Sequence, residues 1–346
     1  MVRGSGAVLL RRFAVMLRSF FSILCVLAAT RGFDADGGRV GAALSGGLPY
    51  DVGESSSAGH LPFFYDVYTF RGEEGGTTVV AAVAVPVKNL RAERRDGRVR
   101  YRFDLRFVLA DTARRSVVSS IDSVFFGVPR ALPGQHLLHT YVETVAPPST
   151  TTVQRVIVTD AARPGRGQLY TTPFLIPDYS GRELMLSDIA LGLPGATAGW
   201  TRRGVTLALL PTSEFPESSF DVYYEIYNLA AGTPYETEIS FERLDGPDGD
   251  EGAVRMLFSG ESTARADDSM GELRRVQSGL AKGRYRLTVT VRNQVSGATA
   301  SSSRPLQVRG WRRGTTLVPA MPKSGAGARS NGPTRLFPKP AERLAL

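Results

Sequence analysis

Histidine is the residue type best suited to bind a metal or act as a base, and this chain has only three histidines. His136 and His139 stand three apart in the run HLLHTYVE, a spacing at which a helix could present both to one zinc ion. Thr140, Tyr141 and Val142 favour a strand instead, and residues three apart on a strand point to opposite faces. We therefore expect no metal site at this pair.

The sequence motifs of hydrolases and of calcium-binding loops are also poorly matched. The sequence lacks a Gly-x-Ser-x-Gly elbow, and the run GESTA at Gly260 shares only a glycine and a serine with it. The remaining histidine, His60, precedes the first expected strand, so a Ser-His-Asp set is not expected. The acidic run from Asp245 to Glu251 lacks the ligand spacing of a calcium loop and is typical of a hairpin turn. We predict a protein that is not an enzyme, with no catalytic residue, no metal and no cofactor.

The most informative segment for binding is the run FDVYYEIYNL from Phe220 to Leu229. Its alternation places apolar side chains on one face and, on the other, Asp221, Tyr223, Glu225 and Tyr227. Hydroxylated aromatic side chains are enriched at binding surfaces, so these four residues form the candidate binding surface. Replacing both tyrosines with serine should then weaken partner binding and leave the fold intact. The alternative is that the tyrosines pair with neighbouring strands or pack between two domains.

The elements that position these residues are strands. Apolar and polar residues alternate along Tyr101–Leu109, Tyr235–Glu242 and Arg284–Arg292, which predicts half-buried antiparallel strands. Residues 77–87 are almost continuously apolar, which indicates a strand covered on both faces. Helical periodicity is nearly absent, and residues 270–280 are the one segment with a weak helical pattern. The sequence therefore predicts an all-β fold.

A chain of 346 residues suggests about two domains. The strand and turn pattern of 156–176 returns at 289–308, about 133 positions later, and in each copy predicts a β-hairpin that closes a sandwich. We expect two tandem immunoglobulin-like β-sandwich domains and a disordered basic C-terminal tail. The expected boundaries are a signal peptide at 1–30, a flexible linker at 31–60, a first sandwich at 61–178, a connector at 179–198, a second sandwich at 199–309 and the tail at 310–346.

The N-terminus has the pattern of an export signal. Arginines precede an apolar stretch of about a dozen residues from Ser19 to Thr30, too short for a comfortable bilayer span. Translation starting at Met16 would give a more compact leader, and the alternative is an uncleaved anchor. We expect an exported protein, periplasmic or in the cell envelope. Removal of the leader would take the only cysteine, Cys25, with it.

The formal charge of +9 is concentrated at the two ends of the chain. Residues 1–32 hold five arginines and no acidic residue, and residues 304–346 hold nine basic residues and one acidic residue. The part between them is mildly acidic, so we expect no nucleic-acid binding. Membrane contact is expected only through an uncleaved leader or the basic tail. Only four of the 42 basic residues are lysines, which we interpret as compositional bias.

Parts of the second half resemble a known family. The segments that show the resemblance are LMLSDIAL from Leu184, GVTLALLPTSEF from Gly204, FDVYYEIYNL from Phe220 and the closing hairpin from Gly283 to Ser303. Together with the strand pattern from Leu61 to Val308, they resemble the β-rich C-terminal part of bacterial exported proteins called GWxTD domain proteins. The domain that gives the family its name is not visible, and the letters GWTR at Gly199 lack its aspartate. The resemblance implies an envelope location and a sandwich fold, and it supplies no catalytic residue.

Together these patterns predict an exported, non-enzymatic β-sandwich protein that acts as a binding or scaffold module in the bacterial cell envelope. Its partner is expected to be an envelope protein or a glycan. The alternative function is an accessory or degenerate domain of an envelope hydrolase or peptidase system that engages glycan. A third possibility is that the cationic tail binds anionic lipid or polymer.

Overall fold

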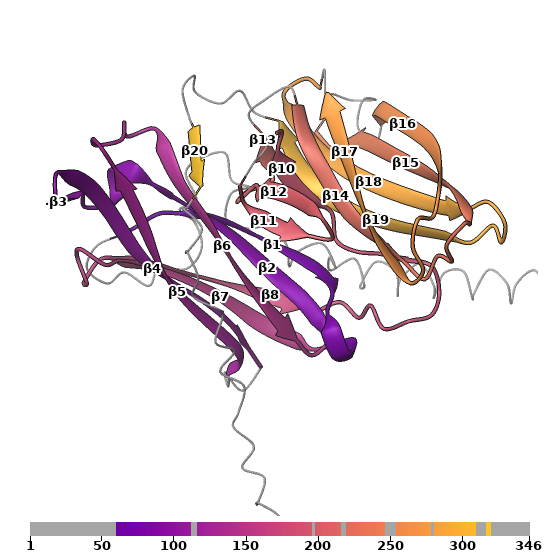
Figure 1. Cartoon of the computed structure of the whole chain (residues 1–346), viewed down its shortest axis with the longest axis horizontal. Coiled ribbons are helices and arrows are strands. Elements are labelled where there is room, and N and C mark those ends of the chain that lie inside the picture. Colours follow the sequence, from indigo (N-terminus) through magenta and orange to yellow (C-terminus); the bar gives the residue numbers. More distant parts are fainter. Residues whose placement is uncertain are drawn as a thin grey trace, which may run out of the picture.

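The computed structural model describes residues 60–111, 116–195, 198–215, 219–245, 254–277, 280–308 and 316–319. The expected signal peptide, nearly all of the linker, most of the acidic run after Asp245 and most of the tail lie outside these residues. The described part is built from strands, with two short 3-10 turns at Glu73–Gly75 and Val87–Asn89 and no α-helix (Figure 1). Within it, no helix is long and apolar enough to cross a membrane. The all-β prediction is confirmed.

The first sandwich consists of two sheets, which we call sheets 1 and 2. Sheet 1 contains β3 (Glu93–Arg95), β4 (Arg98–Ala110), β5 (Ser116–Val128), β7 (Thr151–Asp160) and β8 (Gly167–Leu175). Sheet 2 has the order β1 (Phe64–Arg71), β2 (Thr77–Pro86), β6 (His136–Ala146) and β20 (Thr316–Pro319). All pairings are antiparallel except that between β20 and β6, which is parallel.

The second sandwich also consists of two sheets, sheets 3 and 4. Sheet 3 contains β9 (Met185–Leu186), β10 (Ala190–Leu193), β11 (Trp200–Arg202), β12 (Val205–Leu209), β14 (Ser219–Tyr227) and β17 (Ser269–Gln277). Sheet 4 contains β13 (Glu214–Phe215), β15 (Pro234–Arg243), β16 (Val254–Thr263), β18 (Gly283–Asn293) and β19 (Thr299–Val308). β17 is the last strand of sheet 3 and β16 the last strand of sheet 4.

Three apolar layers separate the four sheets. One fills the first sandwich, one fills the second, and the third lies between the sandwiches, where sheet 2 meets sheet 3. β2 supplies two of these layers, because Val79, Ala81 and Val83 face the first core while Val80 and Ala82 face the layer between the sandwiches. This explains the continuous apolar run at residues 77–87 and confirms that both faces of the strand are covered.

The alternating segments form strands as expected. Tyr101, Phe103, Leu105, Phe107 and Leu109 of β4 are all buried. β15 and β18 bury their alternate residues in the core of the second sandwich. The two similar segments form the hairpins β7–β8 and β18–β19.

Three expectations differ from the structure. Residues 270–280 do not form a helix, because residues 269–277 pair along their whole length with β14 as strand β17. The expected connector at 179–198 supplies β9 and β10 of sheet 3, since its apolar residues complete the second core. Within the expected disordered tail, residues 316–319 form β20, which pairs with the edge of β6.

Candidate functional site

The four residues expected to form a binding surface are buried between the sandwiches. Asp221 is 5% exposed, and Tyr223, Glu225 and Tyr227 are 0% exposed. They lie on the face of β14 that sheet 2 covers, so they are not available to an external partner. The expectation of a surface is wrong, and the alternative, packing between the domains, describes the structure. The other face of β14 packs into the second core as expected.

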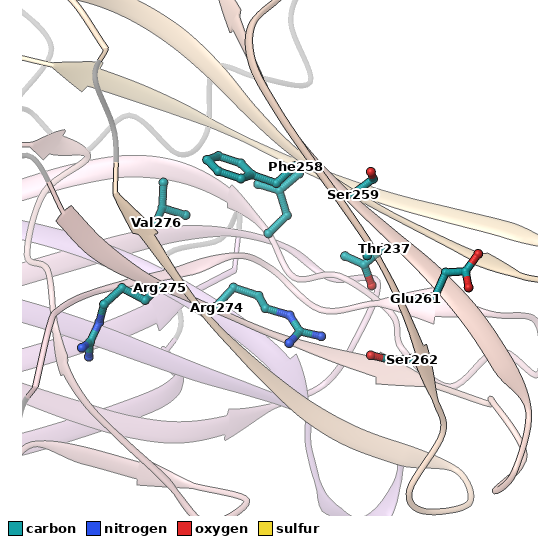
Figure 2. A pocket seen from close by; sticks show the side chains of 10 residues that line it. Thr237, Phe258, Ser259, Glu261, Ser262, Arg274, Arg275 and Val276 are labelled. Atoms are coloured by element: carbon teal, nitrogen blue, oxygen red, sulfur yellow. The ribbon is translucent and has the colours of Figure 1, made fainter.

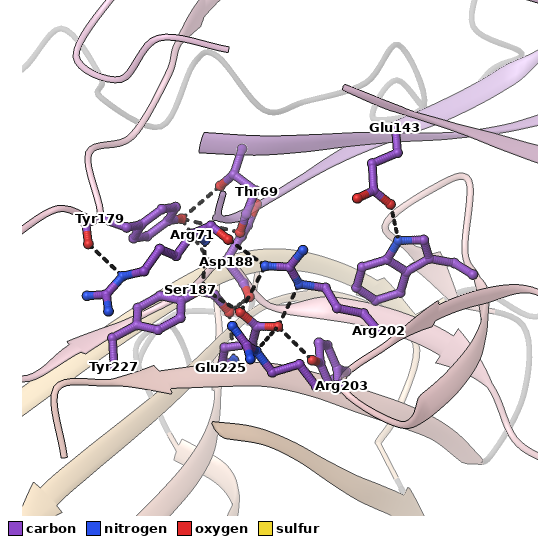
Figure 3. Close-up of polar contacts among 12 residues, drawn as sticks. Thr69, Arg71, Glu143, Tyr179, Ser187, Asp188, Arg202, Arg203, Glu225 and Tyr227 are labelled. Atoms are coloured by element: carbon purple, nitrogen blue, oxygen red, sulfur yellow. Dashed lines mark hydrogen bonds and ion pairs between the residues drawn. The ribbon is translucent and has the colours of Figure 1, made fainter. Parts of the chain in front are cut away.

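Glu225 is the centre of a hydrogen-bond network at this junction (Figure 3). The Tyr223 and Tyr227 hydroxyls donate to its two carboxylate oxygens, each at 2.8 Å. Arg202 donates to the same carboxylate through Nε at 2.6 Å, and the Glu225 backbone N–H donates to the Ser187 hydroxyl at 2.8 Å. Burial, and then the negative charge of Glu225, raise the pKa of both tyrosines, so both phenols stay protonated and act as donors.

The same network joins the two sandwiches through residues that lie far apart in the sequence. Arg202 donates to the backbone carbonyl of Arg71 at 2.5 Å, and the Arg71 backbone N–H donates to the Tyr227 hydroxyl at 2.8 Å. The Arg71 guanidinium lies over the Tyr227 ring, 4.3 Å from its centroid. Arg71 therefore fixes the end of β1 against β14 through backbone and side chain together.

Trp200 is the largest side chain in the layer between the sandwiches. It stacks on Phe70 at 5.0 Å between ring centroids, and its indole N–H donates to Glu143 of the first sandwich at 2.9 Å. Aromatic pairs of this kind contribute about 0.5–1.5 kcal/mol beyond area burial. The preceding Gly199 has a φ of 151°, and a side chain there would start 2.2 Å from the Leu207 carbonyl oxygen. Both residues of the Gly199-Trp200 pair therefore have a structural role in this fold.

A second buried ionic group lies beside this layer. Arg304 of β19 is 2% exposed and pairs with Asp66 at 2.5 Å and with Asp188 at 3.4 Å. Its guanidinium lies 4.3 Å from the centroid of the Tyr68 ring. Burial alone would lower the pKa of Arg304, but the two carboxylates raise it above its ordinary value, so the arginine stays charged. The charge count grouped this residue with the basic C-terminal end of the chain, although the expected second sandwich included it.

The two histidines of β6 have different environments. His139 is buried, and burial lowers its pKa to about 4. The neutral ring makes a hydrogen bond with the backbone of Leu209 in the second sandwich. His136 instead approaches the Pro133 carbonyl oxygen, with Nδ1 at 3.1 Å. Among the described residues, no three His, Cys, Asp or Glu side chains are placed to share a metal ion.

The accessible hollows lie elsewhere, along the edge strands of the second sandwich. The first, which we call the edge hollow, has a volume of about 250 Å³ and opens between β16 and β17 (Figure 2). Its polar lining includes Thr237, Glu261, Arg274 and Arg275. The second, the hairpin hollow, has a volume of about 540 Å³ and lies between β17 and the β11–β12 turn. The two hollows meet at Arg274, which lines both.

Two buried glutamates, Glu272 and Glu225, pair with the arginines that line the hairpin hollow, and each contacts two arginines. Glu272, 5% exposed, pairs with Arg265 at 2.5 Å and with Arg274 at 2.9 Å. The Tyr235 hydroxyl also donates to Glu272, and burial raises the pKa of this tyrosine to about 12. Glu225 pairs with Arg202 and, at 3.4 Å, with Arg203. Each group therefore keeps one positive charge in excess.

The arginines of the hollows are held in place yet remain accessible. The side chains of Arg203 and Arg274 are each 42% exposed, and that of Arg265 is 69% exposed. Sequence reasoning missed them because arginine is abundant throughout the chain. The available signal was the pair of doublets, Arg202-Arg203 beside a turn and Arg274-Arg275 within an alternating segment. The arrangement can bind a carboxylate or another anion.

The sequence matches no family model and no curated protein. Among solved structures, the chain is similar to the C-terminal domain of Wzt, with 12% identity and a TM-score of 0.29 over 39% of this chain and 78% of that one. It is also similar to a β-glucuronidase of Bacteroides uniformis, with 12% identity and a TM-score of 0.26 over 69% of this chain. The match spans 27% of the glucuronidase.

Proposed function

We propose that this chain is an exported, non-enzymatic binding module of the bacterial cell envelope, and that it holds its partner at the edge of its second sandwich. The observation that carries this proposal is the pair of adjoining hollows along β17, with accessible arginines fixed by buried carboxylates. The export pattern at the N-terminus and the family resemblance of the second half support the location.

The junction between the sandwiches supports a binding role in a second way. Because the buried Arg304–Asp66 ion pair and the Trp200 contacts fix the second sandwich against sheet 2, the edge of sheet 3 is held on a large packed body. Sites on strands that neighbouring elements hold in place lose less conformational entropy on binding than sites on loops. The arginines are therefore arranged before a partner arrives.

The proposal is tested by site-specific photo-crosslinking of the full chain in cells that express it. A photoreactive phenylalanine analogue replaces Ser259, an exposed residue of the edge hollow. We expect one specific adduct in the envelope fraction, and its loss when Arg203→Ser and Arg274→Ser are added. The control position is Ser301, exposed on β19 of the same sandwich. An adduct at Ser301 but not at Ser259, or a chain found only in the cytoplasm, would contradict the proposal.

A further inference from the structure

We infer that the occupant of these hollows is an acidic peptide segment of the partner, which adds as an extended strand to β17. This inference rests on the proposed function and specifies its ligand. It follows from three observations: the position of β17 in its sheet, the course of the hollows along it, and the excess of arginines around them.

β17 has a partner strand on one side only within the described residues. β14 pairs with it from Ser269 to Gln277, and sheet 3 ends there. The last strand of a sheet presents a row of backbone N–H and C=O groups that an added strand can pair with. One of these acceptors, the Gly271 carbonyl, already accepts a hydrogen bond from Arg265 at 3.2 Å.

The hollows follow the strand itself. Six consecutive residues, Ser269 to Arg274, line the hairpin hollow, and Arg274 to Val276 line the edge hollow. Side chains of consecutive residues on a strand point to opposite faces. A hollow lined by consecutive residues therefore runs along the edge of the strand, where backbone groups and both faces are within reach.

The positive charge of the lining arginines favours a peptide with acidic side chains. Four arginines and two glutamates line the two hollows, and one of the arginines, Arg275, is already paired with the buried Asp221 at 2.9 Å. Carboxylates bind guanidinium groups through paired, charge-assisted hydrogen bonds, so acidic side chains at alternate positions of an added strand are favoured. The same arginines disfavour a basic strand. The hairpin hollow has no aromatic ring in its lining, whereas Phe258 lines the edge hollow, so a sugar oligomer is included below as a competing probe.

The test uses a synthetic probe and the full chain. The probe is a peptide of alternating glutamate and valine with the nine-residue length of β17, measured by fluorescence anisotropy. We expect saturable binding that weakens with salt, and slower hydrogen exchange of the β17 amides in the complex. Affinity should fall at least tenfold in Arg203→Ser/Arg274→Ser. The matched control, Arg284→Ser/Arg292→Ser, removes two exposed arginines of β18 and should leave affinity unchanged.

Three further probes decide between strand addition and other binding. A peptide with glutamine in place of every glutamate should lose binding, and so should the acidic peptide N-methylated at alternate amides. Equal binding of either peptide would overturn the inference, because acidic side chains or backbone pairing would then not be required. An oligomer of glucuronate that binds where the acidic peptide does not would also overturn it, in favour of glycan. In that case the Ser259 adduct would persist, and the proposed function would stand.

Discussion

β14 and β17 are neighbouring strands of one sheet, yet the structure uses them in opposite ways. On the face toward the first sandwich, Tyr223 lies beside Leu273 and Glu225 beside Gly271. Tyr223 and Glu225 are fully buried, whereas Leu273 is 39% exposed. Gly271 is required at its position, because a side chain would start 2.7 Å from the Tyr223 hydroxyl oxygen. The tyrosines and acidic residues of β14, which have the composition of a binding surface, join the two sandwiches. The accessible charged side chains are on the neighbouring strand, β17.

A polar face that is covered by another sheet is stabilised differently from one that stays in water. Sheet 2 removes water from β14, so each hydroxyl and carboxylate must find a protein partner or cost free energy. Glu225, Tyr223 and Tyr227 satisfy one another and bind arginines. β17 stays in contact with solvent, so its arginines keep an exposed part. Three changes test this contrast, and they follow in order of expected effect.

The largest effect is expected from Tyr223→Ser/Tyr227→Ser. Each tyrosine fills a buried site, and removing large buried aromatic side chains costs about 3–5 kcal/mol each. We expect the double variant to lose about 6 kcal/mol or more of unfolding free energy, measured by chemical denaturation. The matched control on the neighbouring strand, Leu273→Ser, should lose about 1 kcal/mol or less. Equal losses for the two variants would show that the face of β14 is not the buried junction.

A smaller but still large effect is expected from Arg304→Met. The substitution leaves Asp66 and Asp188 buried without their cation, which typically costs about 3–5 kcal/mol. Denaturation at neutral pH measures the loss. The control, Arg292→Met, changes an exposed arginine on the adjacent strand and should stay within about 0.5 kcal/mol of the parent protein. If Arg304→Met were equally mild, the ionic group would not stabilise the junction.

The smallest of the three effects is pH-dependent and comes from His139. Its pKa is about 4 in the folded chain, below the ordinary value of 6.5, so the unfolded chain takes up this proton first. Stability from this group is complete above pH 6.5 and falls as the pH drops toward 4, by up to about 3 kcal/mol.

The measurement compares unfolding free energies of the parent protein and His139→Gln across that range. Carboxylates also titrate there, so the difference between the two proteins isolates the histidine. The parent should lose more stability than the variant on acidification. Parallel curves would show that the buried ring is not held neutral.

Much of the fold could be predicted from the sequence. Alternation along β4, β15 and β18 depends on local burial of one face, and each of these strands forms where expected. The continuous apolar run of β2 correctly indicated cover on both faces. The segment at 270–280 could not be settled in this way, because Arg274 and Arg275 interrupt its apolar pattern and only the pairing with β14 makes it a strand.

The candidate site could be predicted only in part. Alternating tyrosines and acids on β14 indicated polar contacts, but sequence periodicity does not say whether a strand is central or last in its sheet. The arginines of β17 were hidden in an arginine-rich composition. Their grouping depends on Glu225 and Glu272, which residues from distant parts of the chain surround.

The strand content, the two closing hairpins and the alternation of buried and exposed side chains could be predicted from local sequence, because they depend on neighbours within a few residues. The tertiary structure decided which polar face is covered and which edge stays open, because both depend on how sheet 2 packs against sheet 3. Arg304 shows the difference most clearly: its charge was counted with those of the C-terminal end, and in the folded protein it is buried between Asp66 and Asp188.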